Sequence, residues 1–246
     1  MHTARGGKTV FGATLGILML ETRFPRIPGD MGNALTWPFP VQYRIVRSAT
    51  PDRVVRHDAR ALADLFIAQA LDLVAHGCDG ITTNCGFLAI VQDQVARAVP
   101  VPVATSSLMQ VPMVQAMLPP GRRAGILTIS KSTLTPQHLA AANVAPDTPV
   151  WGLEAGREFT RAILNDEPEI DFAACRSDMI DAARAFHAAH PELGAIVLEC
   201  TNMTPYAADL RRVTGLPVFS IYNFVQWFQQ SLMPPRFACD LDDPRP

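Results

Sequence analysis

The chain carries the stretch ITTNCGF at residues 81–87 and the stretch VLECTNM at residues 197–203. Each stretch leads from a short apolar run to one cysteine, Cys85 in the first and Cys200 in the second, and an amphipathic segment follows. The two cysteines are 115 positions apart. Two thiols at matching places in two halves of a chain can face each other across a cleft, with an acid on one side of a carbon and a base on the other.

Two further landmarks indicate an internal repeat. The proline of Val-Pro-Val at 101–103 and the proline of Leu-Pro-Val at 216–218 are also 115 positions apart. The sequence LGIL at 15–18 resembles AGIL at 124–127, with an offset of 109. A repeat of roughly a hundred residues predicts two similar half-domains rather than a solenoid.

Each half of the chain reads as alternating strands and helices. Strands are predicted at 14–20, 79–84, 101–105, 123–129, 148–152, 194–199 and 216–220. Helices are predicted at 59–76, 87–98, 107–117, 136–143, 155–165, 171–189, 203–213 and 221–232. No strand or helix is predicted in the polar, proline-rich segment 22–56, and 234–246 is predicted to be a loose tail.

This alternation predicts an α/β fold with parallel sheets and helices on both faces. In such folds, ligands bind at the carboxyl ends of the strands. Cys85 and Cys200 both lie there, in a strand-to-helix turn. The first backbone N–H groups of the following helix point at this spot, so they can stabilise a thiolate or a substrate carboxylate.

The composition is that of a compact enzyme. The chain has 246 residues, of which 48% are hydrophobic and 18% are charged, and its formal net charge is −2. This length allows a sizeable core in one large domain or two small ones. A nearly neutral chain has no basic footprint for nucleic acid or a membrane surface, and no apolar run is long enough to cross a bilayer.

The five cysteines include no CxxC pair, which favours free thiols in a reducing, cytoplasmic setting. A redox dithiol is the less favoured alternative for Cys85 and Cys200, because it usually has both cysteines in one turn. Buried core filling is the expected role of the other three, Cys78, Cys175 and Cys239.

Hydroxyl side chains follow two other predicted strands, at 105–107 and at 128–133. They can form an anion-binding cradle, or they can be ordinary helix caps, and both can hold at once. The charged, proline-rich segment 21–30 is either a lid with substrate contacts or a solvated loop. His187 and His190 lie three apart, but no third metal ligand is evident.

At the two cysteine stretches and at the strand 125–128, the chain resembles the aspartate/glutamate racemase superfamily, which also includes hydantoin and allantoin racemases, arylmalonate decarboxylase and maleate isomerase. The resemblance covers nearly the whole chain. It implies two pseudo-symmetric α/β lobes with the active site in the cleft between them. It also implies that the last helix returns to the N-terminal lobe, so that this lobe comprises 1–104 plus 220–246 and the C-terminal lobe comprises 105–219.

The resemblance also implies the roles of individual residues. Cys85 and Cys200 match the two catalytic thiols, and no cofactor or metal is implied. The expected substrate is a small carboxylate or hydantoin, and relatives often form homodimers or higher homo-oligomers. The residues implied to bind substrate, around the two thiols and at two other strand ends, are Asn84, Gly86, Phe87, Ser106, Thr128, Ser130, Thr201 and Asn202.

Two departures from the family pattern bear on the substrate. Where glutamate racemases resemble Cys-Asn-Thr, this chain has Cys85-Gly86-Phe87, and where they carry a His two positions after the second Cys, it has Asn202. The usual acid partner is therefore missing, which argues against glutamate. Phe87 is expected to narrow the pocket or to offer an apolar wall.

The expected reaction is racemisation or epimerisation of a small amino acid, related carboxylate or hydantoin by a two-thiol acid/base mechanism. One thiolate removes the α-proton and the opposite thiol returns one to the other face. A downward shift of a cysteine pKa from its usual value of about 8.5 would supply the thiolate. The alternatives are maleate-isomerase-like or arylmalonate-decarboxylase-like chemistry, or a non-enzymatic small-anion binder.

Overall fold

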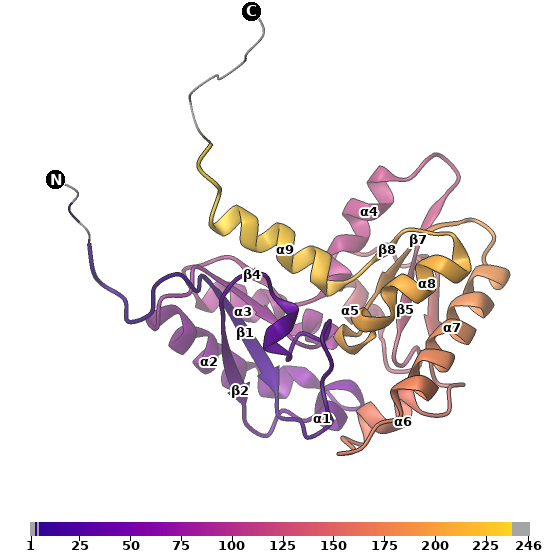
Figure 1. Cartoon of the computed structure of the whole chain (residues 1–246), viewed down its shortest axis with the longest axis horizontal. Coiled ribbons are helices and arrows are strands. Elements are labelled where there is room, and N and C mark those ends of the chain that lie inside the picture. Colours follow the sequence, from indigo (N-terminus) through magenta and orange to yellow (C-terminus); the bar gives the residue numbers. More distant parts are fainter. Residues whose placement is uncertain (1–2, 4, 238–246) are drawn as a thin grey trace, which may run out of the picture.

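The computed structural model describes residue 3 and residues 5–237, and its strands form two four-stranded sheets, one in each lobe (Figure 1). The strand order is β2-β1-β3-β4 in the first sheet and β6-β5-β7-β8 in the second, and the paired strands are parallel. The strands are β1 (Leu15–Leu20), β2 (Val41–Val46), β3 (Gly80–Thr83), β4 (Val103–Ala104), β5 (Arg123–Thr128), β6 (Val150–Gly152), β7 (Leu193–Leu198) and β8 (Val218–Phe219). The shared order confirms the predicted α/β fold with two similar lobes.

Helices flank both sheets. The α-helices are α1 (Pro51–Val55), α2 (Ala63–Ala75), α3 (Gln92–Ala98), α4 (Val111–Met117), α5 (Pro136–Ala141), α6 (Phe159–Leu164), α7 (Phe172–Ala189), α8 (Ala207–Thr214) and α9 (Ile221–Leu232). Short 3-10 helices are η1 (Ala34–Thr36), η2 (Ala59–Leu62), η3 (Gly86–Val91), η4 (Ser107–Gln110) and η5 (Thr201–Tyr206). Both cysteine turns lead first into a 3-10 helix, η3 or η5, and only then into an α-helix.

The repeated glycine of the LGIL and AGIL sequences has a packing role in each lobe. A Cβ on Gly16 in β1 would lie 2.8 Å from Leu73 of α2. A Cβ on Gly125 in β5 would lie 2.6 Å from Phe186 of α7. In both lobes, a helix therefore packs directly against the backbone of a central strand, which only glycine permits.

Helix α9 returns from the second lobe and packs on the first sheet. Its buried side chains form one apolar cluster with Leu15, Ile17 and Met19 of β1, and Figure 1 shows it lying over β4. This packing agrees with a return of the last helix to the N-terminal lobe. The boundaries 1–104 plus 220–246 and 105–219 stay predictions, and residues 238–246 of the predicted tail lie outside the described residues.

The segment 22–56 contains elements that the sequence patterns did not indicate. Edge strand β2 pairs in parallel with β1, and η1 and α1 lie on either side of it in the chain. Strand β2 is mostly half-buried, so its residues VQYRIV lack the continuous apolar run of a central strand. Helix α1 begins with Pro51 at its first position and has Thr50 as its N-cap. A Thr-Pro pair is also common in turns, so the sequence did not indicate a helix here.

None of the helices in the described part of the chain combines the length and the apolarity that a bilayer crossing needs.

Candidate active site

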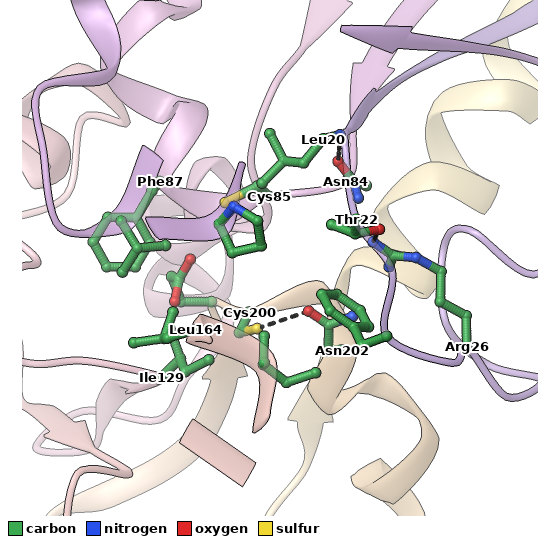
Figure 2. Close-up of a pocket in the computed structure, with 15 residues that line it drawn as sticks. Leu20, Thr22, Arg26, Asn84, Cys85, Phe87, Ile129, Leu164, Cys200 and Asn202 are labelled. Atoms are coloured by element: carbon green, nitrogen blue, oxygen red, sulfur yellow. Dashed lines mark hydrogen bonds between the residues drawn. The ribbon is translucent and has the colours of Figure 1, made fainter. Parts of the chain in front are cut away.

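The two cysteines come from equivalent places in the two lobes. Cys85 lies between the end of β3 and the start of η3, and Cys200 lies between the end of β7 and the start of η5. Figure 2 shows them on opposite sides of one pocket. The predicted meeting of the two thiols at the carboxyl ends of the strands is thus present in the structure.

The pocket is small and mostly apolar. Its walls come from both lobes and from the segment that follows β1. They comprise Leu20, Thr22, Phe24, Arg26, Pro51, Val55, Asn84, Cys85, Phe87, Ile129, Ile163, Leu164, Glu199, Cys200 and Asn202. Arg26 is the one cationic side chain among these lining residues.

Backbone N–H groups lie near both sulfurs, although neither cysteine caps its 3-10 helix with a side-chain hydrogen bond. Those of Phe87 and Leu88 reach Cys85, that of Asn202 reaches Cys200, and each contact favours the thiolate. Burial outweighs them. It raises the pKa of Cys85 to about 12, and it raises the pKa of Cys200 well above its usual value, with the charge of Glu199 adding to both shifts.

The expected downward shift of the cysteine pKa is therefore wrong. The reason is that few polar groups and no free cation replace the water that burial removes from the thiols. These raised pKa values favour the protonated form of both thiols near pH 7.

A buried carboxyl group lies beside the two thiols. Glu199, which directly precedes Cys200, is 1% exposed and lines the pocket. Thr128 Oγ1 donates a hydrogen bond of 2.8 Å to its Oε2. Burial raises the pKa of Glu199 to about 7, against the opposing effects of the Thr128 bond and of the Ile129 backbone N–H.

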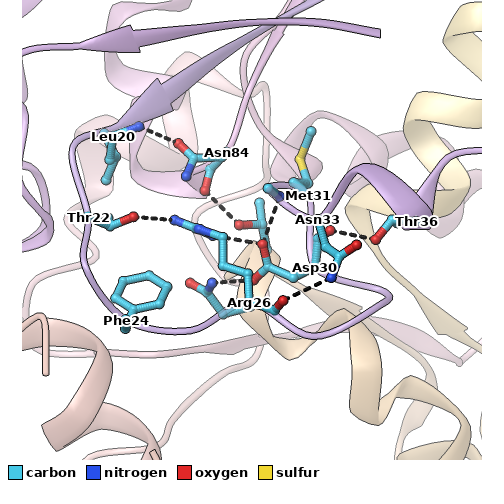
Figure 3. A network of polar contacts seen from close by, with 12 residues as sticks. Leu20, Thr22, Phe24, Arg26, Asp30, Met31, Asn33, Thr36 and Asn84 are labelled. Atoms are coloured by element: carbon cyan, nitrogen blue, oxygen red, sulfur yellow. Dashed lines mark hydrogen bonds and ion pairs between the residues drawn. The ribbon is translucent and has the colours of Figure 1, made fainter. Parts of the chain in front are cut away.

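Residues 22–36, which we call the cover segment, lie over the pocket and connect to the second thiol. Figure 3 shows Arg26 donating to Thr22 at 3.0 Å and to Asp30 at 2.7 Å. Asn202 Nδ2 donates to the other Asp30 oxygen at 2.5 Å, and Cys200 Sγ donates to Asn202 Oδ1 at 3.5 Å. A continuous chain of polar contacts therefore runs from the cover segment of the first lobe to Cys200 of the second.

A second contact ties the cover segment to the other lobe. The backbone N–H groups of Arg23 and Phe24 both donate to Asp166 Oδ1, at 2.6 and 3.3 Å. Three side chains of the segment line the pocket, Thr22, Phe24 and Arg26. Of the two interpretations of residues 21–30, the structure thus supports a cover over the pocket rather than a solvated loop.

The structure brings half of the predicted site residues to the pocket wall. Asn84, Cys85, Phe87, Cys200 and Asn202 line it. Phe87 is the apolar wall that its position predicted, and its outer edge packs on His138 with ring centroids 5.1 Å apart. Asn84 is oriented by the N–H of Leu20, which donates to its Oδ1 at 2.8 Å, so the amide NH₂ end is the one free to turn to the pocket.

The other five predicted residues do not line the pocket, and each supports its surroundings instead. Gly86 packs on Glu199, Ser106 caps η4, and Thr128 holds Glu199. Ser130 bonds to Ser132, and Thr201 Oγ1 donates to the Asn84 carbonyl across the lobe boundary at 2.6 Å. Their hydroxyls are used within the protein, so direct contacts with substrate stay predictions.

The remaining cysteines that the structure describes behave as expected. Cys78 and Cys175 are buried and free, while Cys239 lies outside the described residues. Cys85 and Cys200 are also free, rather than joined as a disulfide. Within the described ranges, no group of three His, Cys, Asp or Glu side chains could hold a metal ion.

Sequence reasoning assigned no role to Glu199 or to the walls that Pro51, Val55, Ile163 and Leu164 supply. A glutamate at the end of an apolar strand, next to a candidate catalytic cysteine, was the available signal for Glu199. The apolar walls gave no signal, because an apolar residue that lines a pocket looks the same in sequence as one that fills a core.

Solved structures with the same fold include two kinds of enzyme. Unliganded arylmalonate decarboxylase aligns with a TM-score of 0.57 and 16% identity, covering 93% of this chain and 96% of that one. A glutamate racemase from Bacillus anthracis aligns with a TM-score of 0.58 and 12% identity, covering 89% and 82%. At these identities the likeness shows the shared fold.

Curated relatives extend over most of the sequence. A dimethylsulfoniopropionate lyase from Durusdinium sp. clade D is 27% identical over 234 residues, which cover 92% of this chain and 77% of the relative. Dimethylsulfoniopropionate lyase 7 from Emiliania huxleyi is 27% identical over 244 residues, which cover 92% and 69%. The family model described as Asp/Glu/Hydantoin racemase matches residues 39–223, a span that holds both cysteine turns. The chain therefore belongs to the Asp/Glu/hydantoin racemase family.

Proposed function

We propose that this chain is a cofactor-independent enzyme that uses a cysteine thiol of the pocket to remove the proton next to the carboxylate of a small substrate. The placement of Cys85 and Cys200 on opposite walls of one pocket carries this proposal. A thiol that releases its proton to solvent as substrate binds becomes a base at the α-carbon, and a positioned base contributes about 10²–10⁴-fold to such a step.

We infer that β-elimination follows the removal of the proton. The curated relatives are named as dimethylsulfoniopropionate lyases, which supports a lyase reaction and a substrate with a leaving group on the β-carbon. For dimethylsulfoniopropionate, the thiolate sulfur takes the α-proton, and the C–H electron pair forms the new double bond. The β-carbon–sulfur bond then breaks, and its electrons leave on neutral dimethyl sulfide, so the other product is acrylate.

The walls of the pocket support a monocarboxylate rather than aspartate, glutamate or another dicarboxylate. A second carboxylate needs a free cation or several free donors in a buried site. Arg26 is already paired with Asp30 and bonded to Thr22. Phe24, Phe87 and Ile163 instead offer apolar surface that suits the methyl groups of a sulfonium or another alkylated leaving group.

Racemisation is the second candidate, and the presence of two thiols favours it. Elimination needs one base, whereas inversion needs a proton donor on the opposite face of the carbon. Cys200 and Cys85 come from different lobes and meet this requirement without any other group. A substrate with no β-leaving group, such as an amino acid or a hydantoin, would return its proton instead of eliminating. A cytoplasmic location, the absence of a cofactor and a homo-oligomeric state remain predictions.

Proton NMR in D₂O separates these reactions. The protein is incubated with dimethylsulfoniopropionate, with single enantiomers of amino acids and hydantoins, and with maleate and arylmalonate. We expect dimethyl sulfide and acrylate from the first substrate. Deuterium entering the α-position of one enantiomer together with loss of optical purity would favour the racemase instead. No reaction with any of these carboxylates would contradict the enzymatic proposal.

A further inference from the structure

One oxygen of a buried carboxyl group in the pocket has no hydrogen-bond partner. Glu199 Oε2 accepts from Thr128, and the Ile129 backbone N–H also faces this carboxyl group, but Oε1 is shielded from solvent and lacks a hydrogen-bond partner among the described residues. Leaving a buried carboxylate oxygen without a donor costs about 1–3 kcal/mol or more. Because Glu199 lines the pocket that holds both thiols, a bound molecule can supply the missing partner.

The position of this oxygen is tightly fixed. A Cβ on Gly86 would lie 2.2 Å from Glu199 Oε1 and 2.3 Å from the Glu199 carbonyl oxygen. The carboxyl group of the second lobe therefore packs directly against the residue that follows Cys85 in the first. Gly86 leaves room for this group, so the contact explains the glycine that stands after the first cysteine.

The groups around Glu199 disfavour its charged form. No cation bonds to it, and the titratable groups that face it are the thiols of Cys85, at the end of β3, and of Cys200, its neighbour in the chain. The Arg26–Asp30 pair of the cover segment lies beyond Asn202, with its charges satisfied within the pair. Burial raises the pKa of Glu199 to about 7, so at pH 6 most molecules carry the proton.

We propose that Glu199 acts as a neutral carboxylic acid that donates a hydrogen bond from Oε1 to the carboxylate of the substrate. The proposal rests on the function proposed above and names the group that holds the anionic end of its substrate. A hydrogen bond to an ionised oxygen is about twice as strong as one between neutral groups. It strengthens further as the carboxylate gains enolate character during removal of the α-proton.

A neutral Glu199 also helps the thiols. In its ionised form, Glu199 raises the pKa of both cysteines, and it would repel the carboxylate of the substrate. Keeping the proton on Oε1 removes both effects. The acid keeps this proton throughout the reaction, so its contribution is to binding and charge stabilisation rather than to proton transfer.

The first test uses propanoate, an unreactive monocarboxylate, so that it does not depend on turnover. The carboxyl signals of the protein with ¹³C-labelled glutamate are followed by NMR against pH, and the Glu199→Gln variant identifies the signal of Glu199. We expect propanoate to raise the pKa of this residue, because an anion that binds only the protonated form stabilises it. A pKa that propanoate leaves unchanged or lowers would overturn the proposal.

The second test compares propanoate affinity across pH in matched variants. In the parent protein, binding is expected to weaken up to about tenfold per pH unit above the pKa of Glu199. Glu199→Gln keeps a neutral donor, so its affinity should stay nearly constant over this range, while Glu199→Ala should bind at least tenfold more weakly at pH 6. Glu192→Gln, an equal change at a half-buried glutamate before β7 and outside the pocket, should follow the parent.

The two proposals can fail separately. Equal pH dependence in the parent and in Glu199→Gln would reject the role of Glu199, even if elimination or racemisation is observed. Absence of turnover with every carboxylate would reject the function, even if propanoate binds through Glu199 as described.

Discussion

The two cysteine turns occupy the same place in the repeat but differ in their surroundings. Next to Cys85, Asn84 is tied to Leu20 within its own lobe. Next to Cys200, Asn202 is tied to Asp30 of the cover segment in the other lobe. The Asn84 side chain is thus held inside its own lobe, although the Asn84 carbonyl accepts from Thr201 of the second lobe, whereas the Asn202 side chain is held by the cover segment of the other lobe.

The thiols differ as well. Cys85 is partly exposed, whereas Cys200 is 8% exposed and has three acidic neighbours, Glu199, Cys85 and Asp30, that raise its pKa. The two halves of the chain therefore place their sulfurs at equivalent positions but surround them with different charges. A pair of equivalent thiols can in this way acquire different tasks on the two faces of one substrate.

Removing either thiol should have the largest effect. Elimination needs one base, so one of the two variants Cys85→Ala and Cys200→Ala is expected to lower α-proton removal by about 10²–10⁴-fold, whereas racemisation should be lost in both. The rate of acrylate release measures this loss for elimination, and deuterium incorporation from D₂O measures it for a substrate without a leaving group. Cys78→Ala in the core of the first lobe tests for a general loss of folding. Parent-like exchange in either variant would remove that thiol from the mechanism.

Removing the Arg26–Asp30 pair of the cover segment should lower the free energy of unfolding. Of the two cysteine turns, it should affect the one that contains Cys200. Asp30→Ala leaves Arg26 unpaired in a buried place, which costs about 3–5 kcal/mol of unfolding free energy. The matched control is Asp93→Ala, because Asp93 and Arg97 form an exposed pair at the same spacing and should contribute at most about 1 kcal/mol. Urea unfolding gives both values. Equal losses would show that the cover segment is not held by this pair.

A side chain at Gly86, next to Cys85, should push against Glu199 of the second lobe and so displace the first cysteine turn. Gly86→Ala places a methyl group against Glu199, and overpacking of this kind costs about 1–3 kcal/mol. Gly6→Ala, at a position with open space around it, should be neutral. Thermal unfolding and propanoate affinity are the measurements. A Gly86→Ala protein with parent stability and affinity would mean that the two lobes do not meet at this point as described.

The smallest expected effect is a difference in the alkylation rates of the two thiols. Iodoacetamide is expected to modify Cys85 before Cys200, since Cys85 is the more exposed residue of the two. Because the pKa of Cys85 is raised to about 12, its rate should climb roughly tenfold per pH unit between pH 8 and 10. Peptide mass spectrometry resolves the two sites. A rate that levels off near pH 8 would instead reveal a thiolate in the resting protein.

Much of the fold could be predicted because its signals are local. The buried run at β1, its counterpart at β5 and the helical stripes between them each fix an element without reference to the rest of the chain. Edge strand β2 and helix α1 escaped prediction because one is half-buried and the other begins at a proline. Their places are set by neighbours that lie far away in the sequence.

The positions of the two cysteines in the site could be predicted from the sequence, but the pKa shifts of the groups in the site could not. The repeat gives Cys85 and Cys200 equivalent places at strand ends in the two lobes, and the family resemblance implied that one cleft between the lobes holds both. The direction of their pKa shifts depends on how completely the lobes and the cover segment exclude water. No local sequence pattern carries this information. The same holds for Glu199, whose character as an acid comes from burial rather than from its neighbours in sequence.

Cross-linking of the two sulfurs tests the central geometry most directly. Dibromobimane carries two thiol-reactive groups a few ångströms apart, and it reacts with cysteines as they ionise at alkaline pH. If the thiols share one pocket, mass spectrometry should find the peptides of Cys85 and Cys200 joined within a single chain, and the link should vanish in Cys200→Ser. Modification of both cysteines by separate reagent molecules, with no joined peptide, would contradict the shared pocket on which the proposed chemistry depends.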